Sequence, residues 1–193
     1  MRVETFLFEG EGPQHTEKTL ELAIEWASKL GSKSIIISST TGESARKALD
    51  MIPDDFKLVV VTHHTGFRAK NKNEFSEDIK KELLDKGHYV LTTTHAFSGV
   101  ERTFRKKFGG LYPLEIMAQT LRMFCEGVKV AVEIAIMAAD AGLVDVERWI
   151  VSCGGTARGL DTAVFLKPAN SNSVFDLEIG GIICKPVEES LQL

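Results

Sequence analysis

Residues 35–46 read Ile-Ile-Ile-Ser-Ser-Thr-Thr-Gly-Glu-Ser-Ala-Arg, and they are the most informative stretch of the chain. The β-branched run at 35–37 predicts a short buried strand, and a helix is expected from about Ser44. The loop between them is rich in hydroxyls and contains Gly42. Hydroxyls, the free N–H groups of a helix's first turn and the positive end of its dipole all attract phosphate. Ser and Thr also cap helices without a ligand, so phosphate binding and plain capping remain alternatives.

Strand and helix patterns alternate on both sides of this stretch, which predicts a mainly parallel sheet covered by helices on both faces. We therefore expect an α/β fold, a three-layer α/β/α sandwich, in one domain over 1–193. Two helices at about 99–124 are expected to form an insertion. The other strands are predicted at 5–8, 58–61, 88–91, 149–152, 162–166 and 179–184, and the other helices at 16–30, 44–51, 76–84 and 128–141.

The overall charge and hydropathy of the chain exclude several classes of function. Its 193 residues carry a formal net charge of −4, whereas a nucleic-acid-binding protein needs a basic face. No apolar run approaches the roughly 20 residues of a membrane helix, and the start of the sequence lacks a signal-peptide pattern. We therefore expect a cytoplasmic protein without nucleic-acid or membrane partners.

Three cysteines without CxxC spacing indicate neither a disulfide framework nor a zinc site. Cys153 comes directly before Gly154 and Gly155 and is a candidate pocket residue. A nucleophilic role for its thiol would require a base, and the sequence places none beside it.

Four predicted loops leave the carboxyl ends of strands, and ligands of such sheets bind at that edge. Each loop combines glycine with small or hydroxyl residues, and two of them add a histidine and a phenylalanine. Polar donors together with flat apolar rings suit a phosphorylated aromatic ligand, either a nucleotide or flavin mononucleotide (FMN), better than a bare sugar phosphate. The candidate cofactor-binding residues are Ser38, Ser39, Thr41, Gly42, Glu43, Ser44, Thr62, His64, Thr65, Gly66, Phe67, His95, Gly154, Gly155, Thr156 and Arg158.

Several of these residues have an ordinary structural alternative. Phe67 and Phe97 are either ligand contacts or core residues. His63 and His64 are adjacent in a strand exit, so at most one of them is expected to face the ligand. A metal site is the rival for the histidines, but no carboxylate lies among them and they share no i, i+4 spacing. We expect no metal.

Charged anchors are fewer. Arg158 stands among small residues and is either an anchor for the phosphate or an ordinary surface arginine. Lys129 and Glu133, at i, i+4 on an apolar helix, form either an anion contact or a salt bridge at the rim. The loop at 38–44 lacks the lysine of a GxxxxGK[ST] motif, and the glycines from Gly154 onward do not match GxGxxG. Triphosphate hydrolysis and dinucleotide binding are therefore not expected.

The hydroxyl loop resembles the phosphate-gripping segment of the pyruvate kinase C-terminal domain. This resemblance implies that Ser39, Thr41, Gly42, Glu43 and Ser44 match positions that hold an allosteric sugar phosphate there.

The whole chain also resembles a family of small stand-alone archaeal and bacterial proteins described as pyruvate kinase α/β domain-like. For that family the resemblance implies a three-layer sandwich and FMN in the cleft, with no settled reaction. The segments that carry it lie at 16–20, 64–67, 98–102, 128–134 and 158–164.

A catalytic pyruvate kinase barrel of roughly 250 residues does not fit within 193 residues, so phosphoryl transfer from phosphoenolpyruvate is not expected. Three functions remain open: an FMN-binding protein, a non-catalytic sensor of a sugar phosphate or nucleotide, and a flavin-dependent enzyme that uses His64 or His95 as acid or base. Catalytic residues and substrate are not identified. The apolar stretch around 111–124 favours a homo-oligomer.

Overall fold

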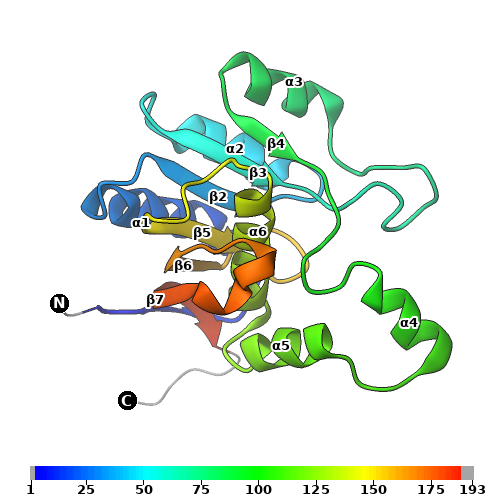
Figure 1. Ribbon diagram of the computed structural model, residues 1–193. Helices are drawn as coiled ribbons and strands as arrows, with labels where there is room; N and C mark the ends of the chain where they lie inside the picture. The colour runs from blue at the N-terminus through cyan, green and yellow to red at the C-terminus, as the bar shows by residue number, and fades with distance from the viewer. Residues whose placement is uncertain (1–2, 188–193) are drawn as a thin grey trace.

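The computed structural model describes residues 3–187 and contains one seven-stranded sheet (Figure 1). The strand order across the sheet is β1-β7-β6-β5-β2-β3-β4. All strands expected from the sequence are present. Their bounds are β1 Phe6–Glu9, β2 Ser34–Ser38, β3 Lys57–Val61, β4 Tyr89–Leu91, β5 Ile150–Gly154, β6 Thr162–Lys167 and β7 Glu178–Val187.

The sheet is mainly parallel, as predicted. β2 pairs in parallel with both β3 and β5, and β3 pairs in parallel with β4. The exception is β6, which runs antiparallel to β5 and β7. Because β5, β2, β3 and β4 are parallel neighbours, their carboxyl ends form one continuous edge.

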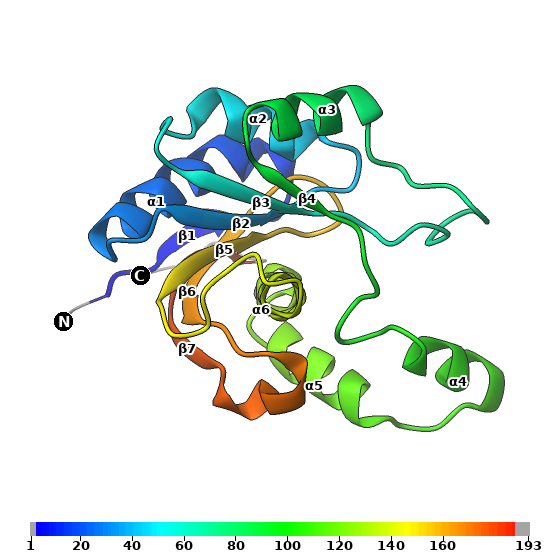
Figure 2. The ribbon, with the colours of Figure 1, turned by 45° about the horizontal axis from the view of Figure 1, so that its top comes forward.

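Helices cover both faces of the sheet and make the predicted three layers. Figure 2 shows α1 and α2 on one face and α6, seen end-on, on the other. Short 3-10 turns, η1 and η2, lie before α1 and between β6 and β7. The bounds are η1 Pro13–His15, α1 Thr16–Lys29, α2 Glu43–Met51, α3 Glu77–Asp85, α4 Glu101–Phe108, α5 Pro113–Arg122, α6 Glu126–Asp140 and η2 Ser171–Asp176.

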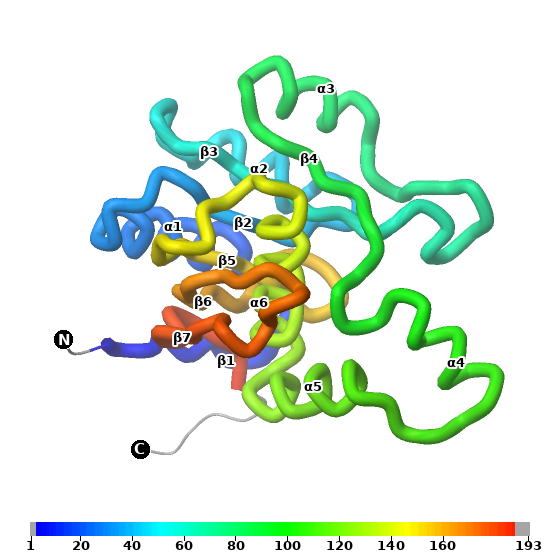
Figure 3. Tube along the Cα trace, viewed as in Figure 1, coloured from blue at the N-terminus to red at the C-terminus, as the bar shows by residue number. Residues whose placement is uncertain are grey.

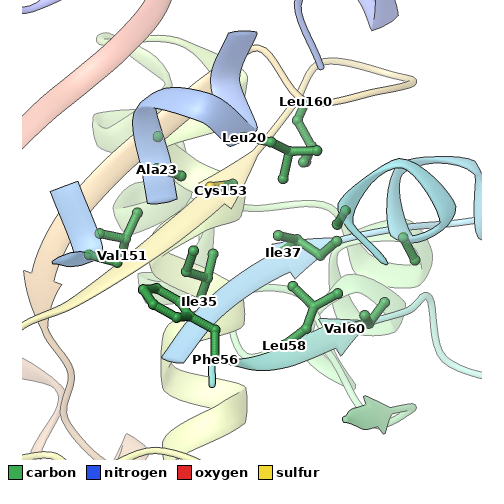
Figure 4. Close-up of a cluster of buried hydrophobic side chains, with 14 of the residues drawn as sticks. Leu20, Ala23, Ile35, Ile37, Phe56, Leu58, Val60, Val151, Cys153 and Leu160 are labelled. Atoms are coloured by element: carbon green, nitrogen blue, oxygen red, sulfur yellow. The ribbon is translucent and has the colours of Figure 1, made fainter. Parts of the chain in front are cut away.

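Alternate residues of the central strands enter two separate cores, because successive side chains of a strand point to opposite faces. On the α1 and α2 side, Ile35, Ile37, Leu58 and Val60 belong to one buried cluster that also contains Leu20 of α1 (Figure 4). On the other side, Ile36 and Val59 pack against α6. This double burial explains the continuous β-branched runs in the sequence.

Helix α6 is buried over nearly its whole length, and α5 packs against it. Its apolar residues, Val128, Ala131, Val132, Ala135 and Ile136 among them, contact the sheet, as the sequence indicated. By contrast, no residue of α4 is buried. Figure 3 shows α4 standing out from the rest of the chain beyond α5.

Within residues 3–187, none of the helices has the length and apolar character needed to cross a membrane.

Candidate functional site

A cleft of about 370 Å³ opens at the carboxyl edge of the sheet. Its walls come from the loops after β2, β3, β4 and β5 and from one side of α6. The volume lies within the range of roughly 300–1,000 Å³ that is usual for small-molecule sites. The shared direction of these four strands brings together loops that are far apart in the sequence.

The hydroxyl loop forms one end of the cleft. Ser38, Ser39, Thr40, Thr41 and Ser44 all line it. Ser39 is only 5% exposed, and its Oγ has no hydrogen-bond partner in the structure. A buried hydroxyl without a partner costs free energy, so a partner is expected to come from outside the chain.

Helix α2 begins at this loop with its first N–H groups uncapped by a side chain. Its N-cap is Gly42, and no serine or threonine accepts a hydrogen bond there. The plain-capping explanation for the hydroxyls is therefore wrong. Gly42 has a φ of 106°, and a Cβ at this position would lie 2.7 Å from Ile79 Cδ1. The positive φ favours glycine at the start of α2, and a larger residue would also have to displace the end of the Ile79 side chain.

Aromatic side chains gather at the exits of β3 and β4. The rings of His63 and Phe67 stack with their centroids 4.0 Å apart. His95 lies 5.4 Å from Phe67 and 5.3 Å from His64, centroid to centroid. Phe97, by contrast, is buried in the core and does not line the cleft.

The hydrogen bonds of the adjacent histidines separate their roles. His63 Nδ1 lies 3.1 Å from Glu74 Oε2, and the ring lines the cleft. His64 Nδ1 lies 2.9 Å from the carbonyl oxygen of Thr65, and its ring is not part of the cleft wall. One of the pair faces the cleft, as the sequence led us to expect, but it is His63 where the candidate set had His64.

His95 is held neutral by its surroundings. Burial lowers the pKa of its imidazole to about 4, although the nearby Glu133 carboxylate partly opposes this shift. Nearby positive charge, including that of Lys129, acts in the same direction as burial and contributes to this low pKa. At neutral pH, the uncharged imidazole of His95 can therefore accept a hydrogen bond from a bound molecule.

Lys129 and Glu133 form an ion pair on the α6 wall of the cleft. Their side chains are 7% and 5% exposed, so the expected position at the rim is wrong. Glu133 Oε1 also accepts a hydrogen bond from the Phe97 N–H at 2.8 Å. A lysine and a carboxylate are thus fixed together inside the cleft.

Arginines surround the cleft opening. Arg68 pairs with Glu74 at 3.0 Å, and Arg122 Nε donates to Glu126 Oε2 at 2.5 Å. The guanidinium of Arg102 lies 5.0 Å above the Phe67 ring. Arg158 is exposed and also lines the cleft. Anionic ligands would meet a cationic rim.

Asp161 fixes the glycine-rich loop that follows β5. Its side chain is fully buried and accepts hydrogen bonds from the N–H groups of Gly12, at 3.2 Å, and Thr156, at 3.1 Å. Thr162 donates its hydroxyl to the same carboxylate at 2.8 Å. The hydroxyl of Thr156 itself is buried and has no partner.

The structure brings most of the candidate residues together. Ser38, Ser39, Thr41, Glu43, Ser44, Thr62, Phe67, His95, Gly155 and Arg158 line the cleft. The remaining candidates belong to the same loops without lining it, namely Gly42, His64, Thr65, Gly66, Gly154 and Thr156.

Sequence reasoning missed cleft residues of two kinds. The cleft residues of α6 recur at helical spacing. This spacing could have identified one side of the helix as a cleft wall, but the whole helix was interpreted as core. Of the arginines, Arg102 lies in the segment 98–102 that carries the family resemblance, whereas Arg68 and Arg122 lie in stretches without a recognised pattern. The missed residues include Arg68, Arg102, Arg122, Glu126, Val130, Ile134 and Met137.

One further expectation, for Cys153, is settled by its position. Cys153 is fully buried in the core, and burial raises the pKa of its thiol, so a pocket position is wrong (Figure 4). Over residues 3–187 the structure shows no cluster of three or more His, Cys, Asp or Glu side chains that could hold a metal ion.

The family described as "Pyruvate kinase, alpha/beta domain" matches residues 17–165, which is most of the chain. The chain belongs to this family. The match to the pyruvate kinase α/β domain runs from the start of α1 into β6 and includes every loop of the cleft.

Solved structures similar to this chain include pyruvate kinases from Cryptosporidium parvum. One is 13% identical, covers 80% of this chain and 23% of that chain, and has a TM-score of 0.41. Another, in complex with ADP, is 14% identical, covers 78% of this chain and 22% of that chain, and has a TM-score of 0.35. This pyruvate kinase α/β domain thus spans less than a quarter of the enzymes it matches.

Proposed function

We propose that this protein binds a phosphorylated ligand, FMN, in the cleft, with the phosphate on the hydroxyl loop. The observation that carries this proposal is the buried Ser39 hydroxyl, which has no partner and lies beside the uncapped start of α2. A phosphate would accept hydrogen bonds from that hydroxyl and from the first N–H groups of the helix.

The aromatic end of the cleft suits the flavin ring. The rings of His63, Phe67 and His95 line this end, and Lys129 offers a buried positive charge on the α6 wall. A cation there would stabilise negative charge on the ring. Bound FMN would supply electron or hydride transfer, while the chain's residues hold and orient it.

The test compares FMN with riboflavin, which has the same ring but no phosphate. We expect purified protein to carry or bind a flavin that absorbs near about 450 nm. Ser39→Ala should weaken FMN binding about tenfold, through loss of a hydrogen bond to a charged group, and leave riboflavin binding unchanged. A fluorescence titration measures both affinities. Absence of flavin absorbance and of binding to added FMN would exclude the proposal.

A second candidate is a non-catalytic sensor of a sugar phosphate or nucleotide. It is favoured by the hydroxyl loop itself, whose buried donors fit any phosphate monoester. A thermal shift panel separates the two. A ligand at about one hundred times its dissociation constant should add roughly 2.7 kcal/mol to the free energy of unfolding. The sensor function predicts that a sugar phosphate or nucleotide stabilises the protein more than FMN does.

A third candidate is a flavin-dependent enzyme of unknown substrate. The position of His95 favours it, because its imidazole lines the cleft and could exchange a hydrogen bond with a reacting molecule there. His95→Gln should then preserve flavin content and abolish turnover once a substrate is known. Pyruvate kinase activity is not part of this proposal, since residues 3–187 form one sheet and no barrel.

We also propose that the chain forms a homo-oligomer in the cytoplasm. Large apolar side chains are exposed on α4, on α5 and in the loops beside them, and a second copy of the chain would remove them from water. They are Phe104, Phe108, Leu111, Ile116, Met123 and Phe124.

A further inference from the structure

A second, smaller cavity of about 200 Å³ lies between α4, α5 and the start of α6. We call it the α4–α5 pocket. Arg102, Arg122 and Lys129 line both this pocket and the main cleft. The two spaces are therefore neighbours that share these three cationic side chains.

Positive charge dominates the lining of the α4–α5 pocket. It contains the cations of Arg102, Arg105, Arg122 and Lys129, but only two carboxylates. One of these, Glu101, accepts the N–H groups of Leu114 and Glu115 through Oε1, at 3.0 and 3.3 Å, and so caps the start of α5.

The other carboxylate, Glu115, is also committed. Its Oε2 lies 2.5 Å from Arg105, and its Oε1 accepts from the Gln119 amide at 2.7 Å. Arg122 and Lys129 are paired with Glu126 and Glu133, which line the main cleft and not this pocket.

Arg102 is the cation left over. No carboxylate lies within ion-pair distance of Arg102 among residues 3–187. Its guanidinium lies over the Phe67 ring. Stacking on a ring leaves the in-plane N–H groups of a guanidinium available, and their fork matches a carboxylate.

We propose that the α4–α5 pocket binds a small organic acid whose carboxylate pairs with Arg102. The cavity corresponds to roughly six or seven waters at the ~30 Å³ that each takes in the liquid, which suits a short carboxylic acid. Its placement next to FMN rests on the proposed function. Binding of the acid to the pocket is independent of FMN. Where FMN is bound in the cleft, the pocket serves as the site of a second reactant beside the flavin ring.

The test is calorimetry with succinate, with its uncharged diamide succinamide, and with inorganic phosphate, on protein with and without added FMN. We expect succinate to bind in both forms and succinamide not to bind. Arg102→Gln should weaken succinate binding at least tenfold, with Arg102→Lys intermediate. Lys106→Gln, an exposed cation of the same helix that lines neither space, is the matched control and should change nothing.

Ser39→Ala separates this proposal from the previous one. It should weaken FMN and leave succinate unaffected, whereas Arg102→Gln should lower succinate affinity in FMN-free protein as well. Four outcomes would each overturn the proposal for the α4–α5 pocket. The first two are that succinate does not bind, or that its binding depends on Ser39 and not on Arg102. The other two are that succinamide binds equally well, or that phosphate binds better than succinate. If succinate binds through Arg102 and FMN does not bind, only the FMN proposal fails. Thermal melting of each variant confirms that it is folded.

Discussion

The Ser39 hydroxyl is buried without a partner, so its removal should not harm the free protein. Ser39→Ala is expected to leave the free energy of unfolding unchanged or to raise it by up to about 1 kcal/mol, because an unsatisfied polar group disappears. Urea denaturation without ligand measures this.

Ser152→Ala is the matched control at another buried serine. The Ser152 hydroxyl donates to the Ala131 carbonyl at 2.8 Å, so its loss should cost about 1 kcal/mol. A loss of stability as large in Ser39→Ala would mean that the Ser39 hydroxyl already has a partner within the chain.

His95 should make stability depend on pH. The unfolded chain takes up a proton at this residue below about pH 6.5, and the folded chain only below about pH 4. Stability is therefore full above pH 6.5 and falls as the pH drops from 6.5 to 4, by up to about 3 kcal/mol. His95→Gln should flatten this part of the curve in urea denaturation.

An NMR titration checks the same group directly. The imidazole resonance that disappears in His95→Gln should titrate near pH 4. A midpoint near 6.5 for this resonance would contradict the described burial of His95.

At the scale of the element, α6 contains a buried ion pair that can be dissected. Lys129→Met leaves the Glu133 carboxylate buried without its cation and should cost about 3–5 kcal/mol. The double variant Lys129→Met, Glu133→Gln should recover most of this loss, because the glutamine still accepts from the Phe97 N–H.

Denaturation of the two single variants and the double variant gives the coupling energy. A coupling near zero would show that Lys129 and Glu133 are independently solvated. Arg122→Met, which breaks the half-exposed pair with Glu126, is the comparison and should cost much less.

The helices and strands were the part of the fold that could be predicted well from the sequence. The runs at 35–37 and 58–61 are buried on both faces, so their composition indicates a strand without any knowledge of neighbours. The direction of β6 was not predictable in the same way, because an antiparallel partner and a parallel one bury the same residues.

At the scale of the whole molecule, the loops of the cleft followed from the topology, but their side-chain directions did not. His63 and His64 have the same chemistry, and only the hydrogen bonds to Glu74 and to the Thr65 carbonyl distinguish them. Arg102 reaches the cleft from α4, and nothing local in its sequence indicates the Phe67 ring beneath it.

The proposed oligomer can be tested through the exposed apolar side chains of the α4–α5 segment. Phe108 and Met123 are 67% and 85% exposed, so the double variant Phe108→Ser, Met123→Ser should shift the protein toward monomer. Phe175→Ser, at a residue 89% exposed on η2, is the control. Light scattering during gel filtration gives the mass, and a monomeric wild type at high concentration would contradict the proposal.

Asp161 joins the N–H of Gly12 to the N–H of Thr156, although 149 residues of chain separate Gly12 from Asp161. During synthesis on the ribosome, the early segment emerges long before the carboxylate that holds it. The loop after β5 therefore acquires its final position only once residue 161 has been made and has folded back onto the start of the chain. A ligand that needs this loop in its final position could therefore bind only after residue 161 has been made.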